Sequence, residues 1–134
     1  MRWNVEEMPF YRDAVRFVAL AEAEAARVAR VRSDIADNRR RSSTSALFNL
    51  REALHEFAPL EKARVLRIMQ RETGECCAAF DAIIVLNMHQ DETHIAKDLG
   101  LSLIRQAGGL GRAAMKRRET KGSVSRRPKK EEAG

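Results

Sequence analysis

The side chains of this 134-residue chain that could perform chemistry are three histidines, two cysteines and a set of carboxylates. His89, Asp91 and His94 are ligand types that bind zinc. They fall in and beside a predicted loop between two helices, and no second pair of ligands completes a tetrahedral site. His55 stands apart on the polar side of a predicted helix. We therefore expect solvated residues at these positions and no metal site.

Cys76 and Cys77 are neighbours within a predicted helix. Neighbouring helical side chains point about 100° apart, so these two thiols do not form a normal disulfide with each other. We expect two small core residues, and a redox or intermolecular role is the alternative.

No other pattern indicates catalysis or a cofactor. The glycine-rich run 108–111 falls within a helical pattern, and it does not follow a strand as a phosphate-binding loop would. No nucleophile is placed beside a plausible base. The sequence therefore predicts a protein that is not an enzyme, with no catalytic residue and no cofactor.

The excess of basic residues lies at the C-terminal end. Residues 1–111 contain 16 basic and 16 acidic side chains, whereas residues 112–134 contain nine basic and three acidic ones and account for the net charge of +6. Such a run binds phosphate groups through counterion release. Residues 112–134 include no aromatic residue, so this segment cannot stack on bases. A tail that only improves solubility is the alternative. The predicted nucleic-acid-binding residues are Arg41, Arg112, Lys116, Arg117, Arg118, Lys121, Arg126, Arg127, Lys129 and Lys130.

Helices must position these groups. The composition includes only three prolines and many Ala, Leu, Arg and Glu residues, which favours helix over strand. Beyond about Arg118 apolar periodicity ends, so we predict one domain over residues 1–118 and a basic, disordered tail over residues 119–134. The short loops predict an all-α, up-down-up-down four-helix bundle. Its predicted helices cover residues 9–31, 33–57, 59–87 and 91–118.

Several of these helices carry apolar residues on more than one side. A helix that covers a single core needs one stripe, so a second apolar side indicates a second packing partner. Phe48, Ile68, Leu101 and Ile104 lie on such second sides and form the predicted oligomer interface. Gly74, in the middle of a helix, marks either a tight helix crossing or a neutral change.

Apolar runs are short throughout the chain. None reaches the roughly 20 residues that a membrane span needs, and the N-terminus lacks the apolar segment of a signal peptide. We therefore expect a cytoplasmic protein without a membrane partner.

Three stretches resemble one protein family. Residues 40–53, Arg-Arg-Ser-Ser-Thr-Ser-Ala-Leu-Phe-Asn-Leu-Arg-Glu-Ala, resemble the pattern R-R-A-x-x-S-I-x-x-N-I-A-E-G. Residues 61–68, Glu-Lys-Ala-Arg-Val-Leu-Arg-Ile, resemble E-K-A-R-F-x-R-I, and residues 75–81, Glu-Cys-Cys-Ala-Ala-Phe-Asp, resemble E-C-A-A-x-L-D. These patterns are typical of the four-helix-bundle proteins of rRNA intervening sequences, which are similar in fold to the accessory variability proteins of diversity-generating retroelements.

The resemblance implies a protomer that assembles as a ring, typically a pentamer. It also implies a basic surface used on nucleic acid and, in the retroelement branch, a reverse-transcriptase partner. Asn49, Glu52 and Glu75 match positions of the patterns, so we expect structural hydrogen bonds from them between two helices. The chain departs from the patterns at Ala53 and Glu72, where the family has glycine.

We therefore expect a non-enzymatic, oligomeric four-helix-bundle protein that binds nucleic acid, with RNA or an RNA–protein complex favoured. A narrower hypothesis makes it an accessory subunit of a retroelement reverse transcriptase. The alternative is a protein-interaction scaffold without a nucleic-acid role, because the second apolar sides would also serve that purpose.

Overall fold

The fold is a bundle of α-helices. The computed structural model describes the backbone of residues 4–133 and the side chains of residues 4–120. No strand is present across residues 4–133, so the all-α class is confirmed. The elements are the short 3-10 helix η1 (Val5–Glu7) and the α-helices α1 (Pro9–Val28), α2 (Ser33–His55), α3 (Pro59–Val85) and α4 (Asp91–Ala133).

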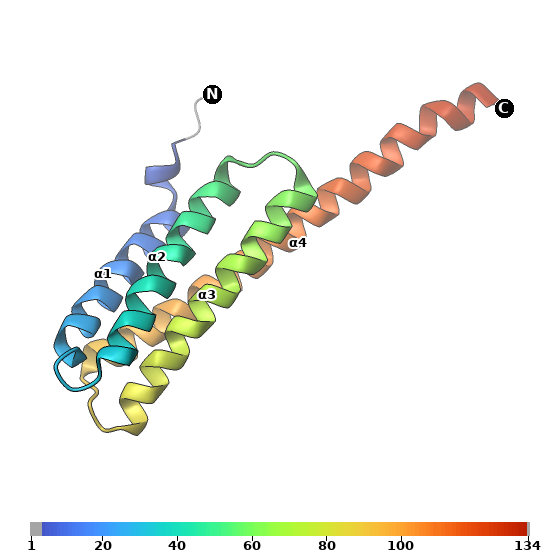
Figure 1. Ribbon diagram of the computed structural model, residues 1–134. Helices are drawn as coiled ribbons and strands as arrows, with labels where there is room; N and C mark the ends of the chain where they lie inside the picture. The colour runs from blue at the N-terminus through green and yellow to red at the C-terminus, as the bar shows by residue number, and fades with distance from the viewer. Residues whose placement is uncertain (1–3, 134) are drawn as a thin grey trace.

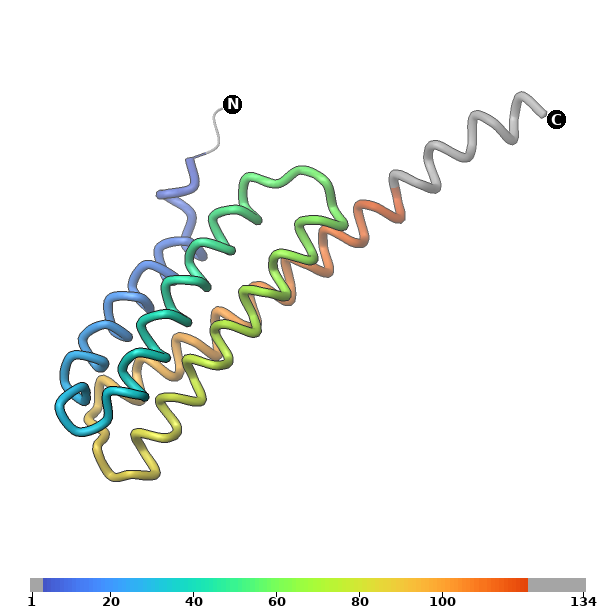
Figure 2. The backbone as a smooth tube through the Cα atoms, in the orientation of Figure 1, coloured from blue at the N-terminus to red at the C-terminus, as the bar shows by residue number. Residues whose placement is uncertain are grey.

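Consecutive helices run in opposite directions and are joined by short connections (Figures 1 and 2). α1 and α3 each pack against both α2 and α4, so the four helices close around one core. α4 is the longest, and it continues past the bundle at the end where α2 and α3 are connected (Figure 1). We call this end of the bundle the arm end.

Two of the helices begin at a proline. Pro9 and Pro59 begin α1 and α3, at a position where a missing N–H removes no helical hydrogen bond. Ser33 and Asp34 are residue types that favour the N-cap position, but the N-cap of α2 is Arg32 and the helix begins at Ser33. Asp34, in the first turn, forms a salt bridge with Arg32 at 2.8 Å.

α3 ends in a Schellman motif. Asn87 takes the left-handed conformation, with φ of 57°, and its N–H donates to the carbonyl of Ile84. The N–H of Met88 donates to the carbonyl of Ile83, which completes the motif. The helix therefore ends at Val85, before the predicted end at Asn87.

The core contains large side chains from α1 and α3 beside small residues that let helices approach. The rings of Phe17 and Phe80 meet edge to face, with centroids 6.1 Å apart. Ala21 and Ala25 of α1 are fully buried. Cys76 and Cys77 are buried and free, so the prediction of two core residues is confirmed.

Gly100, and not Gly74, lies at a close approach between helices. A β-carbon at Gly74 would meet nothing within 4 Å, so the tight crossing considered there is absent. A β-carbon at Gly100 would lie 2.5 Å from the Cys77 Sγ and 2.9 Å from the Phe17 ring. α1, α3 and α4 therefore leave no room for a side chain at Gly100.

α4 continues past the predicted domain end at Arg118. Glu119 and Thr120 are helical, and the Thr120 hydroxyl donates to the carbonyl of Lys116 at 3.1 Å. The boundary and the disorder predicted from residue 119 are therefore wrong at these two positions, because Met, Lys, Arg and Glu are strong helix formers. The side chains of residues 121–134 lie outside the described ones.

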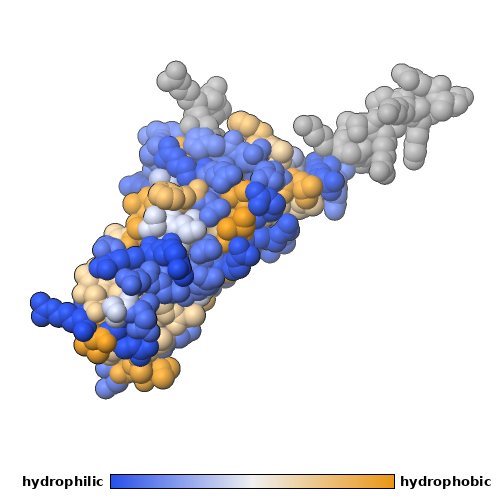
Figure 3. Space-filling model, viewed as in Figure 1, coloured by the Kyte–Doolittle hydropathy of each residue, from blue (hydrophilic) through white to orange (hydrophobic). Residues whose placement is uncertain are grey.

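The predicted oligomer-interface residues lie outside the core. Phe48 and Leu101 are exposed, and Ile68 and Ile104 are half-buried. On the face shown in Figure 3, hydrophobic surface forms separate patches among hydrophilic surface. These residues leave apolar surface on three helices, and the oligomer itself stays a prediction.

Candidate nucleic-acid interface

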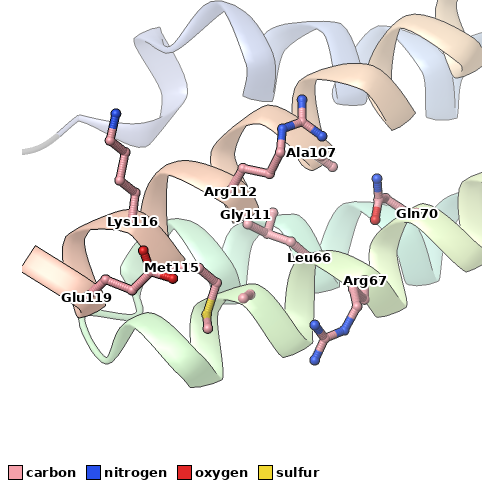
Figure 4. Close-up of a pocket in the computed structure, with 11 residues that line it drawn as sticks. Leu66, Arg67, Gln70, Ala107, Gly111, Arg112, Met115, Lys116 and Glu119 are labelled. Atoms are coloured by element: carbon pink, nitrogen blue, oxygen red, sulfur yellow. The ribbon is translucent and has the colours of Figure 1, made fainter.

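Basic side chains gather at the arm end. Arg112, Lys116, Arg117 and Arg118 are all exposed on α4. Arg112 and Lys116 are four residues apart and extend from the same side of the helix (Figure 4). None of the four forms a salt bridge with a carboxylate of residues 4–120. They are therefore free to take an anionic ligand.

A hollow of about 580 Å³ lies between α3 and α4 at the arm end (Figure 4). Arg67 lines it from α3, and Arg112 and Lys116 line it from α4, with Glu119 as the acidic residue of the lining. Gln70, also in the lining, donates to a carbonyl of α4 at 3.0 Å and ties the two helices together. The hollow therefore adds a cation from α3 to the predicted set.

Sequence reasoning missed Arg67. From the sequence, Arg64 and Arg67 are expected to form ion pairs with carboxylates of their own helix. Arg64 does pair with Glu61, at 2.5 Å, whereas Arg67 pairs with no carboxylate in the described part of the chain. Arg67 joins the site only because α3 packs against α4, and no local sequence pattern predicts that contact.

A second hollow, of about 820 Å³, lies between the α2–α3 connection, the start of α3 and α4. Lys62, Lys116 and Arg117 are its basic residues, and Glu56 is its acidic one. Burial lowers the pKa of Lys62, and the positive charge of Arg117 lowers it further. We call this space the Phe57 hollow, and its lining residues are Glu56, Phe57, Pro59, Lys62, Leu110, Ala113, Lys116, Arg117 and Thr120.

The arginine cluster of α2 does not join the arm end. Arg39 is fully buried, Arg40 pairs with Glu22 at 3.1 Å, and Arg41 is exposed. Arg41 lies about 21 Å along α2 from the arm end at His55, at ~1.5 Å per residue. The structure therefore separates this predicted contact from those on α4.

The other predicted contacts lie outside the residues whose side chains are described. They are Lys121, Arg126, Arg127, Lys129 and Lys130.

The three predicted structural polar residues behave differently from one another. Glu75 accepts a hydrogen bond from the Ser42 hydroxyl at 3.4 Å, which links α3 to α2. Asn49 donates to the carbonyl of Ser45 at 2.8 Å, so its bond stays within α2. Glu52 is exposed, and within residues 4–120 it has no hydrogen-bond partner in the neighbouring helix. The predicted hydrogen bond between helices is therefore wrong for Asn49 and Glu52. Asn49 bonds instead to the carbonyl one turn earlier in its own helix, and Glu52 faces solvent.

The histidines and acidic residues do not gather into a metal site. Within the described residues, no group of three or more His, Cys, Asp and Glu side chains comes together. The rings of His89 and His94 meet edge to face, with centroids 5.2 Å apart.

A buried ionic network lies at the opposite end of the bundle, and sequence reasoning missed it. Glu24 of α1 is 3% exposed, accepts from the Arg27 Nε at 2.8 Å and accepts from the hydroxyl of Thr93 at the start of α4. Thr93 in turn accepts from the N–H of Gln90 at 3.0 Å. Burial acts to raise the pKa of Glu24, but hydrogen bonds from Arg27 and Thr93 outweigh it and hold that pKa below its ordinary value. The network links the start of α4 to α1. The feature of the sequence that could have indicated it is Glu24, a glutamate within the apolar stripe of α1.

Arg39 is a buried cation in the middle of this protein. Its guanidinium lies over the Phe80 ring, 5.1 Å from the centroid. None of its three side-chain nitrogens has a hydrogen-bond partner among the described residues. Burial lowers the pKa of Arg39. A buried charge without hydrogen bonds costs stability, so Arg39 is a weak point of the core.

Comparison of the chain with protein-family models, with characterised proteins and with solved structures gives no match. No helix of the described part is both long and apolar enough to cross a membrane. The family resemblance of residues 40–81 therefore stays a prediction.

Proposed function

We propose that this chain is a non-enzymatic, oligomeric four-helix-bundle protein that binds nucleic acid through its arm end, with RNA or an RNA–protein complex as the ligand. The observation that supports this proposal is the set of exposed cations on α4, Arg112, Lys116, Arg117 and Arg118, none of which forms a salt bridge with a carboxylate of residues 4–120. Arg67 and Lys62 extend that set from α3. Each phosphate that such a surface neutralises releases condensed counterions, which drives binding.

Self-association belongs to the same proposal. The exposed side chains of Phe48 and Leu101 supply apolar surface for contacts between copies. A ring of such copies, which the resemblance of residues 40–81 implies, would present several arm ends to one nucleic acid and raise the avidity. Membership of the rRNA intervening-sequence family, a pentameric ring and a reverse-transcriptase partner are the finer parts of this proposal, and they rest on that resemblance.

The direct test replaces Arg112, Lys116 and Arg117 together by alanine. Binding of a labelled RNA is measured by fluorescence anisotropy at several salt concentrations. Each lost phosphate contact changes the slope of log K against log salt by roughly 0.7 on a single strand, so the slope should flatten by about 2.

The matched control removes three exposed arginines from α1 and the connection that follows it, and therefore changes the net charge equally. The control positions are Arg12, Arg16 and Arg30. Binding by this control variant should stay close to that of the unmutated protein. Equal losses in the two triple variants would show that net charge, and not the arm end, determines binding.

A protein-interaction scaffold is the second candidate, and the uncovered Phe48, which is 67% exposed, favours it. A pure scaffold predicts a stable oligomer by light scattering that does not bind RNA at low salt. Salt-dependent RNA binding that survives in the control variant and fails in the arm-end variant would exclude that candidate.

A further inference from the structure

Among the described residues, the most exposed large apolar side chain lies at the arm end. Phe57 is 93% exposed and sits in the short connection between α2 and α3. Leaving a phenylalanine in water forgoes the stabilisation that burial would supply. The connection is nonetheless well tied: the N–H of Glu56 donates to the carbonyl of Ala53 at 3.2 Å, and the Glu56 carboxylate accepts from the N–H of Ala58 at 2.9 Å. Phe57 is therefore held outward by an ordered turn.

The surroundings of Phe57 combine an apolar floor with cations. Pro59, Leu110 and Ala113 line the Phe57 hollow beside the ring. Lys62, Lys116 and Arg117 also line it, and none of them forms a salt bridge with a carboxylate of residues 4–120. The carboxylate of Glu56, the acidic residue of the lining, already accepts from Ala58. The hollow therefore suits a flat apolar group that is attached to negative charge.

An unpaired nucleotide has both of these properties. Its base has a π-face that stacks on an aromatic ring whatever the base identity, and its phosphates attract lysine and arginine. In a duplex the bases are already paired and stacked, so an exposed aromatic ring reaches them only in single strands, loops or ends. The basic segment of residues 112–134 has no aromatic residue, but the fold places Phe57 beside its first cations.

We propose that the Phe57 hollow is a stacking site for an unpaired base, with Lys62, Lys116 and Arg117 contacting the flanking phosphates, so that the protein prefers single strands to duplexes. This inference rests on the proposed function and names its ligand class. The volume of about 820 Å³ lies within the range of roughly 300–1,000 Å³ that is usual for small-ligand sites.

The test compares Phe57→Ala with the unmutated protein on two probes, a labelled single-stranded oligouridine and an RNA duplex of the same length. Loss of one stacked base should weaken single-strand binding by about five- to 150-fold. Duplex binding should change by less than about twofold, because phosphate contacts carry it. Phe57→Trp should retain single-strand binding, and Phe57→Leu, which keeps apolar bulk but has no π-face, should not.

Leu60→Ala is the matched control, because Leu60 is a 52% exposed apolar side chain of the same region and does not line the hollow. It should bind both probes normally. A second readout uses Phe57→Trp in a chain whose single native tryptophan, Trp3, is changed to Phe. The single strand should quench the emission of the new tryptophan, and the duplex should not.

The outcomes separate this inference from the proposed function. If Phe57→Ala weakens both probes equally or neither, while the arm-end triple variant still fails, stacking is refuted and phosphate binding stands. If Phe57→Ala instead impairs capture of a poly-glutamate peptide and leaves oligouridine binding unchanged, the hollow is a protein-docking site. If the unmutated protein binds neither probe at low salt, both proposals are overturned.

Discussion

Two glycine-to-alanine substitutions should have opposite effects on the free energy of unfolding. Both Gly74 and Gly100 lie inside helices, where alanine is favoured over glycine by about 1 kcal/mol. Gly74 has open space around its absent side chain, so Gly74→Ala should stabilise the protein by about that amount.

At Gly100 the same gain in helix propensity is opposed by a steric clash. The new β-carbon would lie 2.5 Å from the Cys77 Sγ and 2.9 Å from the Phe17 ring, so one of these core groups must shift. Overpacking of this kind costs about 1–3 kcal/mol, which offsets or exceeds the gain in helix propensity. Gly100→Ala should therefore destabilise the protein by roughly 0–2 kcal/mol.

Urea unfolding followed by circular dichroism, at one protein concentration, measures the difference between the two variants. A spread of about 1–3 kcal/mol corresponds to midpoints roughly 0.5–1.5 M apart if m is ~2 kcal/mol/M. Cys77→Ala removes the nearest obstructing atom, so its combination with Gly100→Ala should cost less than the sum of the single changes. If Gly100→Ala proves as stable as Gly74→Ala, the packing of α1, α3 and α4 around Gly100 is not as described.

Four further predictions follow from the core, the thiols and the surface. Arg39→Met should raise the free energy of unfolding by about 1 kcal/mol or more in urea, since it removes a buried cation without hydrogen bonds; a loss would mean that the guanidinium is satisfied. Stability from Glu24 should be present above pH 4.5 and should decrease as the pH falls through its depressed folded pKa, so Glu24→Gln should flatten the acid limb of a stability–pH curve. Burial raises the pKa of Cys76 to about 12 and of Cys77 to about 11, so a thiol reagent at pH 8 should label them only as the protein unfolds. Phe48→Asp should lower the mass found by light scattering and leave the helical circular dichroism unchanged.

Periodicity was a sufficient guide to the fold because each helix buries one stripe. The four predicted helices all exist, with starts that Pro9 and Pro59 mark in the sequence. The ends were less predictable, since α3 stops where Asn87 can adopt a left-handed conformation, and α4 continues past Arg118, where apolar periodicity ends. Local patterns contain little information about such ends.

The candidate site was predictable only in its charge. Counting basic residues identifies Arg112 to Arg118, because they follow one another in the chain. Arg67, Lys62 and Phe57 join them through contacts between helices that are distant in sequence. The link from Glu24 to Thr93 was missed for the same reason. The charge of a segment can be counted from the sequence, whereas the residues that lie beside that segment in space depend on how the helices pack.

The salt dependence of RNA binding by the unmutated protein tests the central claim most directly. With Arg112, Lys116, Arg117 and Arg118 each neutralising one phosphate, log K should fall with log salt with a slope of about −3 on a single strand, or steeper if further cations contribute. A slope near zero, or no binding at low salt, would contradict the assignment of the arm end as a nucleic-acid interface.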